Sequence, residues 1–186
     1  TKRDLSMHSL DDLPTPFALV DLDRLERNTQ AMSARAHQLG VHLRPHVKTH
    51  KTTQGARHQT VGHFGGIAVS TLAEVALYGA SGFADITYAV PITPSKIPRA
   101  IELSRTLDQL YVLVDRSEVV TALSQQCAAQ RERLSVLIKI DCGYGRAGLS
   151  PDDPTLPSLA RTISDDPWLD FAGVLTHGGQ SYDCVN

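Results

Sequence analysis

The sequence alternates between short apolar runs with the character of β-strands and longer segments with helical periodicity. Strands that alternate with helices pair in parallel, and apolar runs that are continuous indicate strands covered on both faces. The pattern therefore predicts an α/β fold, built either as a doubly wound sheet or as a (β/α) barrel. The strand-like runs are residues 17–22, 42–47, 65–70, 85–90, 110–114, 134–141 and 170–175.

Helices are expected between these runs, with start signals that can be read from individual residues. Ser70 or Thr71 is placed to cap a helix, and Glu74 completes the spacing of a capping box. The helix after residue 93 is entered through proline. The expected helical segments are 23–40, 71–82, 94–107, 116–134 and 156–165, with a polar helix or turn near 52–60.

Several classes of function lack their usual signals in this sequence. No Gly-x-Gly-x-x-Gly motif follows the first strand and no P-loop is present, which disfavours nucleotide binding. A net charge of −2 gives no reason to expect nucleic acid, and no apolar run is long enough to cross a membrane. The N-terminus lacks the apolar core of a signal peptide, and three cysteines without CxxC spacing suit a reducing compartment. We expect a cytoplasmic protein with a small-molecule partner.

The segment RPHVKTHK, residues 44–51, carries five residues that can bear positive charge. It begins inside a strand-like run and continues past its carboxyl end, where α/β folds bind ligands. If the strand continues, His46, Lys48 and His50 share one side. Crowded cations favour a neutral, nucleophilic lysine and attract a phosphate. An amine nucleophile beside an anion site suggests pyridoxal phosphate, which needs both.

Three other interpretations of this segment stay open on the residues alone. A short basic run is often a solvated surface. It can also contact a phosphate backbone, although such binding requires a wider basic field. His46 and His50 could be a metal pair, but no third ligand lies at a supporting spacing.

RPHVKTHK, placed after TPFALVDLDRLERN, resembles the pyridoxal-lysine region of the D-serine dehydratase and D-threonine aldolase family. Further blocks resemble the family in the same order, and the likeness covers nearly all of residues 14–183. The blocks are GIAVSTLAEVALYGASGFADITYAVP, YVLVDRSE, IKIDCGYGRAGL and FAGVLTHGGQSY. The resemblance implies a (β/α)8 barrel of the alanine racemase N-terminal type (fold-type III), incomplete in this chain, with a C-terminal β domain expected but absent. Residues 1–22 would pair with that domain, and residues 23–186 would form a partial barrel of six strands.

The resemblance also implies roles for four residues. Lys48 would attach pyridoxal phosphate and act as the catalytic base, with Lys51 a neighbour or a surface residue. Arg146, in a glycine-rich loop, would face the phenolic oxygen of the cofactor, and His177 and Tyr182 would surround its ring. On the residues alone, Arg146 could be an exposed turn residue and Tyr182 a rim residue. For Ser70 and Thr71, helix capping is a better expectation than a contact with the cofactor.

The expected activity is a pyridoxal-phosphate lyase acting on β-hydroxy D-amino acids. Dehydration of D-serine or 3-hydroxyaspartate-like substrates to a keto acid and ammonia is the leading interpretation. The alternatives are D-threonine aldolase, an amino-acid racemase and a non-catalytic pyridoxal-phosphate-binding protein. The resemblance further implies a divalent metal, zinc or manganese, held by the expected C-terminal domain, and a homodimer; no metal ligand is assigned within this chain.

Overall fold

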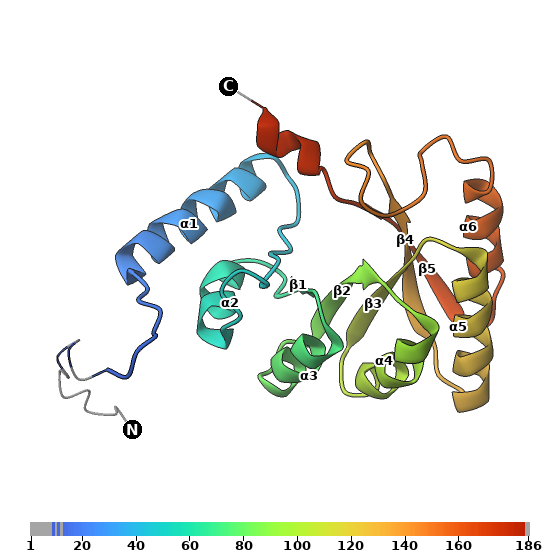
Figure 1. Cartoon of the computed structure of the whole chain (residues 1–186), viewed down its shortest axis with the longest axis horizontal. Helices are drawn as coiled ribbons and strands as arrows, with labels where there is room; N and C mark the ends of the chain where they lie inside the picture. The colour runs from blue at the N-terminus through green and yellow to red at the C-terminus, as the bar shows by residue number, and fades with distance from the viewer. Residues whose placement is uncertain (1–8, 10, 12, 185–186) are drawn as a thin grey trace.

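The computed structural model describes residues 9, 11 and 13–184, which form one parallel sheet with helices along it and a long first helix that stands away from the sheet (Figure 1). The strands are β1 (Ile67–Val69), β2 (Asp85–Pro91), β3 (Gln109–Val114), β4 (Leu134–Ile140) and β5 (Leu169–Thr176). The helices are α1 (Leu22–Gln38), α2 (Thr53–Thr60), α3 (Leu72–Ala80), α4 (Ile97–Ser104), α5 (Ser117–Gln130) and α6 (Leu156–Ser164), with 3-10 turns η2 (Pro94–Lys96) and η3 (Gly179–Asp183). Five predicted strands and every predicted helix are therefore present.

The strands follow one another in the sheet in chain order, β1-β2-β3-β4-β5, and each neighbouring pair is parallel. A doubly wound sheet reverses its order at a switch point, whereas a β/α barrel adds each strand to the same edge. Figure 1 shows α3, α4, α5 and α6 along the outer side of this sheet. The described residues thus form part of a β/α barrel, which resolves the two architectures that the sequence left open.

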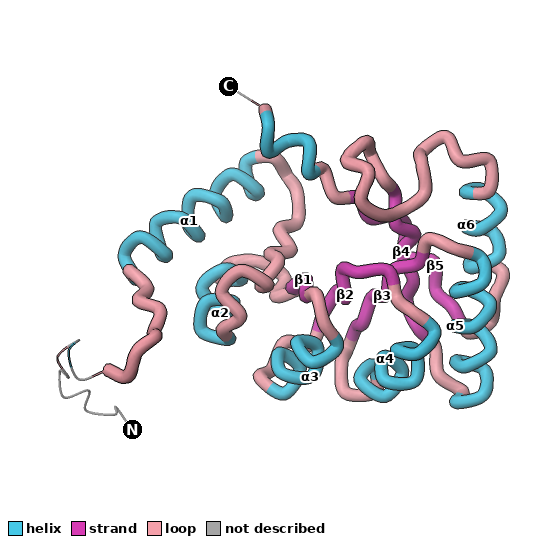
Figure 2. Tube along the Cα trace, in the orientation of Figure 1, coloured by secondary structure: helices cyan, strands magenta, loops and turns pink. Residues whose placement is uncertain are grey.

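The predicted strand 42–47 is reduced to a single bridge between His46 and Ala68. Val47 donates its N–H to Ala68 and Ala68 donates to Pro45, at 3.0 and 2.9 Å. The next bond toward the N-terminus would need an N–H on Pro45, which proline lacks. After Val47 the chain turns, and Lys51 donates its N–H back to the Val47 carbonyl at 3.0 Å. Figure 2 shows this connection between α1 and α2 passing beside β1.

The run 17–22 forms no strand with the described residues. Leu22 is already the first residue of α1, because the Asp21 side chain accepts the N–H of Arg24 at 2.9 Å and caps the helix. Phe17, Leu19 and Val20 are exposed. Residues 1–8, 10 and 12 of the predicted N-terminal segment lie outside the described residues, so its pairing with a further domain stays a prediction.

The core lies between the sheet and the helices that follow each strand. Side chains from β2, α4, α5, β4 and α6 are fully buried there, and each contributes about 1.5–3 kcal/mol when removed from water. Examples are Ile86, Ile101, Leu123, Ile138 and Ile163. Strand β5 differs from the expected double coverage: Val174 is exposed, because β5 is the last strand of the described sheet. No helix within residues 9, 11 and 13–184 is both long and apolar enough to cross a membrane.

Helix α3 begins with the predicted capping box. The Thr71 side chain accepts the N–H of Glu74 at 3.1 Å, and the Glu74 carboxylate accepts the N–H of Thr71 at 3.0 Å. The same carboxylate oxygen accepts the N–H of Ser70 at 2.8 Å. Three backbone donors that would lack partners at the helix start are thereby satisfied. The end of β1 and the start of α3 are consequently held in one conformation.

Replacing Thr71 with alanine is expected to lower the free energy of unfolding by about 1 kcal/mol, because the N–H of Glu74 loses its acceptor. Urea denaturation measures the change. The matched control is Thr162→Ala on α6, where the hydroxyl bonds only the Ser158 carbonyl of its own helix. That control is expected to change stability by less than about 0.5 kcal/mol. Equal losses in the two variants would contradict the importance of the cap.

Candidate active site

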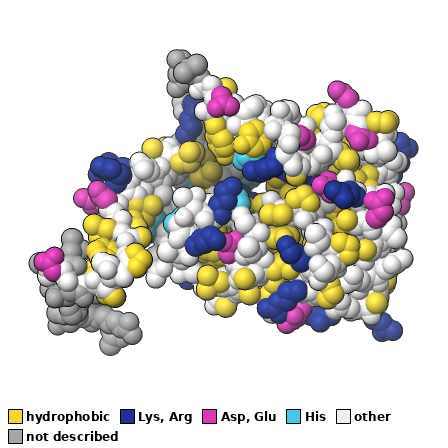
Figure 3. All heavy atoms as spheres, in the orientation of Figure 1, with side chains coloured by type: hydrophobic (Ala, Val, Ile, Leu, Met, Phe, Trp, Pro, Cys, Tyr) yellow, Lys and Arg dark blue, Asp and Glu magenta, His cyan; other side chains and the backbone are white. Residues whose placement is uncertain are grey.

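Three of the four residues to which the resemblance assigns roles meet at a cavity of about 480 Å³. It lies at the carboxyl ends of the strands, because Ser70 follows β1, Pro91 ends β2, and Arg146 and His177 follow β4 and β5. In the space-filling view, Lys, Arg and His side chains gather around the hollow in the middle of this face (Figure 3). The lining residues are Arg44, His46, Lys48, Ala68, Ser70, Ala89, Val90, Pro91, Lys139, Arg146, Ala147, Leu175, Thr176 and His177. Lys48, Arg146 and His177 thus share one cavity, as expected.

Only part of the basic segment 44–51 faces the cavity. Lys48 is exposed at the cavity, and His46 lines the wall beside it. His50 does not share their side, contrary to the expectation, because the chain turns at residues 47–50 instead of continuing as a strand. The ring of His50 bonds Gln59 through Nε2 at 2.8 Å and accepts the N–H of Thr52 through Nδ1 at 3.1 Å. His50 therefore anchors the start of α2.

The two outer cations of the segment are paired with carboxylates. Arg44 donates from Nη1 to the Asp85 carboxylate at 2.7 Å and lies over the rings of Phe64 and Tyr111. The ammonium group of Lys51 lies 3.3 Å from Oε1 of Glu74, and its backbone has a φ of +50°. Lys51 is thus held at the start of α3 and does not line the cavity. Of the three cations in the segment, Lys48 is the one without a carboxylate among its described contacts.

Arg146 is presented by a loop that folds back on the end of β4. The Asp141 carboxylate accepts the N–H groups of Gly143 and Gly145, both at 3.0 Å. These bonds to Gly145 and Gly143 hold the pKa of Asp141 below its usual range. Leu149 closes the loop through backbone bonds to Lys139 and Asp141. Asp141 therefore holds the backbone of the loop that carries Arg146.

His177 lies among three aromatic or cationic neighbours. Its ring meets those of Tyr144 and Tyr182 edge to face, with centroids 5.5 and 5.8 Å apart. The Arg146 guanidinium lies over Tyr144 at 5.7 Å. Tyr182 follows in η3, is 72% exposed and does not line the cavity. The structure therefore brings Tyr182 to His177 but leaves its expected contact with a ring in the cavity a prediction.

Lys139 is a cavity residue that the sequence analysis missed. It lies on β4, is 4% exposed and faces the same cavity as Lys48. Within residues 9, 11 and 13–184, its amine has no hydrogen bond or ion pair to another side chain. Burial, followed by the charge of Arg146, lowers its pKa from the usual value. The available signal was a single lysine inside the apolar strand LSVLIKI, since lysine is almost never buried without a reason.

Burial and the neighbouring cations together lower the pKa of His177. Burial is the largest cause that lowers its pKa below 6.5, followed by the charges of Arg146, Lys139 and Lys48. A histidine whose folded-state pKa is depressed contributes stability above pH 6.5, and this contribution is lost as the pH falls through the lowered value. His177 is therefore neutral at pH 7, when it can accept or donate a hydrogen bond.

Replacing Arg146 with glutamine is expected to raise the pKa of His177 while leaving it below 6.5, because burial remains. An NMR titration of the ring protons measures the shift. Arg99→Gln serves as the control, since Arg99 is an exposed α4 residue paired with Glu102. A pKa of His177 that is the same in the Arg146 variant and in the wild type would show that the two groups do not interact.

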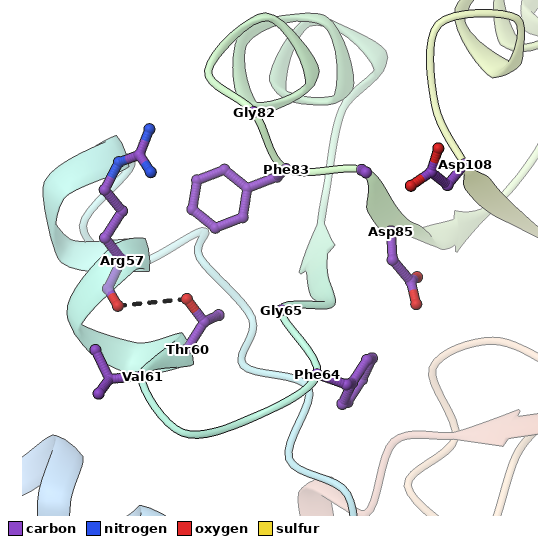
Figure 4. Close-up of a pocket in the computed structure, with 10 residues that line it drawn as sticks. Arg57, Thr60, Val61, Phe64, Gly65, Gly82, Phe83, Asp85 and Asp108 are labelled. Atoms are coloured by element: carbon purple, nitrogen blue, oxygen red, sulfur yellow. Dashed lines mark hydrogen bonds between the residues drawn. The ribbon is translucent and has the colours of Figure 1, made fainter.

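A second cavity of about 480 Å³ lies at the opposite end of the strands (Figure 4). Its wall is formed by Phe64 and Gly65 before β1, by Gly82 and Phe83 before β2, and by Asp108 before β3. It contains no lysine, and ligands of parallel α/β folds bind at the carboxyl ends. Among the described residues, no three His, Cys, Asp or Glu side chains form a group that could hold a metal ion. The candidate site is therefore the cavity that contains Lys48.

Several known proteins are similar to this chain in sequence and in fold. Residues 20–184 match the family model described as alanine racemase, N-terminal domain. D-threo-3-hydroxyaspartate dehydratase of Delftia sp. (strain HT23) is 41% identical over 172 residues, which are 92% of this chain and 45% of that protein. D-serine dehydratase of Dictyostelium discoideum is 36% identical, over 94% of this chain and 47% of that protein, and D-threonine aldolase of Arthrobacter sp. is 32% identical, over 89% and 43%.

Solved structures agree with these sequence matches. The structure of D-threo-3-hydroxyaspartate dehydratase from Delftia sp. HT23 superposes with a TM-score of 0.88 at 40% identity, over 94% of this chain and 46% of that one. Alanine racemase from E. faecalis, at 22% identity and a TM-score of 0.74, shares the fold. This chain spans slightly under half the length of the curated relatives it matches. It belongs to the family of proteins that contain the alanine racemase N-terminal domain.

Proposed function

We propose that this chain is the cofactor-binding part of a pyridoxal-phosphate lyase that acts on β-hydroxy D-amino acids. The observation that carries the proposal is the meeting of Lys48, Arg146 and His177 at one cavity at the carboxyl ends of parallel strands. The names of three relatives support it, since serine, threonine and 3-hydroxyaspartate all carry a hydroxyl on the β-carbon. The proposal keeps the four residue roles that the resemblance implies.

The residues present fit pyridoxal phosphate. A volume of about 480 Å³ lies within the usual range for small-molecule sites. The lining contains Lys48, Lys139 and Arg146 but no Asp or Glu, so it suits a ligand with several negative charges. The buried side chain of Lys139 forms no salt bridge among the described residues, although the charge of Asp141 acts on it, and an anionic ligand in the cavity would pair with its amine. When bound, pyridoxal phosphate supplies an aldehyde that condenses with amines and a ring that accepts electrons from the α-carbon.

Each residue then has a distinct task. Lys48 would hold the cofactor through its amine, and its free amine would serve as the general base for the α-proton. Arg146 donates hydrogen bonds to the phenolic oxygen, and its position on a closed loop fixes their direction. His177, neutral at pH 7, would contact the cofactor ring, and Tyr182, whose ring meets that of His177, would complete this side of the site. These tasks require all four side chains to reach the same ligand, which is the testable content of the assignment.

Dehydration is the favoured reaction. The identity to the Delftia dehydratase, 41%, exceeds that to the Arthrobacter aldolase, 32%. Loss of water from the β-carbon leads to a keto acid and ammonia, whereas removal of the hydroxyl proton breaks the Cα–Cβ bond and releases an aldehyde. A divalent metal, zinc or manganese, that polarises the β-hydroxyl and a homodimer belong to the same proposal. Both rest on the resemblance to the family.

The test is a product assay on the full-length protein loaded with pyridoxal phosphate. D-threo-3-hydroxyaspartate, D-serine and D-threonine are supplied separately, with and without a metal chelator. Keto acid and ammonia support the dehydratase, and aldehyde with glycine from D-threonine supports the aldolase. Cofactor binding without any product would indicate a non-catalytic pyridoxal-phosphate-binding protein, and failure to bind the cofactor would overturn the whole proposal.

A further inference from the structure

His46 connects the reactive lysine to the start of α3. The backbone N–H of Lys48 donates to Nδ1 of His46 at 3.3 Å, and Nε2 of the same ring lies 3.4 Å from the Ser70 hydroxyl. Both contacts lie at the cavity wall, which His46, Lys48 and Ser70 line together. The bridge between His46 and Ala68 fixes the backbone beneath the ring. One side chain therefore touches the Lys48 backbone and the end of β1 at the same time.

The far end of this chain of contacts is fixed by Glu74. Its carboxylate is buried and accepts the N–H groups of Ser70 and Thr71 at 2.8 and 3.0 Å. The bonds to Ser70, Lys51 and Thr71 outweigh burial and hold the pKa of Glu74 below its usual value. Lys51, which belongs to the same basic segment as His46, also forms a 3.3 Å ion pair with Glu74. Ser70 is consequently a rigid partner for the His46 ring.

The two contacts define the protonation of the ring. A backbone N–H can donate only to a nitrogen with a free lone pair, so Nδ1 must be unprotonated. The proton of the neutral ring then lies on Nε2 and is donated to the Ser70 hydroxyl. A charged ring carries protons on both nitrogens and cannot accept the N–H of Lys48. The geometry thus requires a neutral ring with one tautomer.

We propose that His46 is a positioning residue for Lys48. Its neutral ring, oriented by Ser70, accepts the Lys48 backbone N–H and sets the direction from which the lysine enters the cavity. The inference rests on the proposed function, because it assumes that Lys48 is the residue that attaches the cofactor. It assigns His46 a task that could not be inferred from the charge pattern of the basic segment.

The surroundings of the ring support a neutral His46. Burial lowers its pKa most, and the charges of Lys48 and His177 lower it further, whereas Glu74 on α3 raises it. These three groups lie in its own segment, in α3 and in the loop after β5, and the other charged residues that line the same cavity are Arg44, Lys139 and Arg146. As the pH falls through the lowered pKa of His46, the ring gains a proton and the acceptor for Lys48 is lost. Positioning by His46 is therefore intact above pH 6.5, the ordinary pKa of histidine.

The test compares how fast Lys48 captures pyridoxal phosphate in the apo form of the full-length protein. Capture is trapped with borohydride and assigned by peptide mapping, so the readout does not depend on turnover. His46→Leu keeps an apolar body but removes the acceptor, and it is expected to slow capture about three- to tenfold at pH 7.5. His46→Asn places an amide oxygen where Nδ1 lies and is expected to restore the rate to within about twofold of wild type.

A matched control lies in the same segment. His50→Leu also removes an Nδ1 acceptor, that of Thr52, but His50 does not line the cavity. It is expected to lower stability and to leave capture by Lys48 within about twofold of wild type. Nitrogen NMR of His46 is expected to show the proton on Nε2, and Ser70→Ala is expected to reduce the population of that tautomer. This spectroscopic readout remains available if His46→Leu fails to fold.

Two outcomes would overturn the inference while leaving the proposed function intact. One is capture by His46→Leu at the wild-type rate. The other is a His46 ring whose proton lies on Nδ1, because that ring could not accept from Lys48. A label on any lysine other than Lys48 in the wild-type protein would instead overturn the proposed function, and with it the premise of this inference.

Discussion

Replacing Lys48 with alanine is expected to abolish covalent attachment of pyridoxal phosphate and to lower turnover by about 10²- to 10⁴-fold or more. The lower bound follows from the loss of one positioned general base, and the loss of the attachment point adds to it. Borohydride reduction and peptide mapping measure the attachment, and the product assay measures turnover. The fold is expected to survive, since Lys48 is exposed and donates only its backbone N–H to the hydrogen bond with His46.

Two other lysines provide the controls for this prediction. Lys51 is three residues away but is paired with Glu74, and Lys139 shares the cavity but lies on β4. Lys51→Met and Lys139→Met are both expected to retain the label on Lys48. If Lys139→Met lost the label while Lys48→Ala kept it, the buried lysine would be the attachment point and the present assignment would be wrong.

Replacing Gly148 with alanine is expected to displace the Arg146 loop and to have the largest structural effect of the single changes proposed. Gly148 has a φ of +114°, and a Cβ there would lie 2.8 Å from backbone atoms of Lys139, Ile140 and Asp141. The unfavourable backbone conformation costs about 1–3 kcal/mol by itself. The contact adds to that cost, because strand backbone cannot rotate away as a flexible side chain can. Urea denaturation and the affinity for pyridoxal phosphate measure the two consequences.

Gly143 is the matched control, since it has a similar φ of +110° but no atom within 4 Å of the position that a Cβ would take. Gly143→Ala is expected to show only the conformational cost. The difference between the two variants therefore isolates the contact of Gly148 with β4. Equal losses of stability and of cofactor affinity in both would mean that the close packing of the loop against β4 is unimportant.

Local patterns identified most of the secondary structure correctly. Thr71 and Glu74 predicted the capping box because a cap needs only residues three apart in the chain. Pro94 likewise opens the 3-10 turn η2, and Pro98 lies in the first turn of α4. The strand predicted at 42–47 is shorter than expected. Its composition is typical of a strand, but continued pairing with β1 would need an N–H on Pro45, which proline lacks. The run 17–22 forms no strand among the described residues, and its pairing with a further domain stays a prediction.

Site residues could be predicted where reactive side chains are neighbours in the sequence or where a motif resembles that of a known family. RPHVKTHK pointed to Lys48, and the glycine-rich loop pointed to Arg146. Lys139 escaped notice because a lone lysine in an apolar strand gains meaning only when the strand is known to face a cavity. His50 was misplaced because the turn after Val47 rotates it away from Lys48.

The sequence by itself determined the order of strands and helices, their parallel pairing and the crowding of Lys48 among other basic residues. Those properties follow from periodicity, caps and residue chemistry, all of which act over a few positions. Only the tertiary structure decided which basic side chains of the segment lack a carboxylate partner. Asp85 and Glu74, which are distant in the chain, pair with Arg44 and Lys51. Charge neutralisation depends on distances in space, so five basic residues that look alike in sequence acquire different tasks once the barrel strands align.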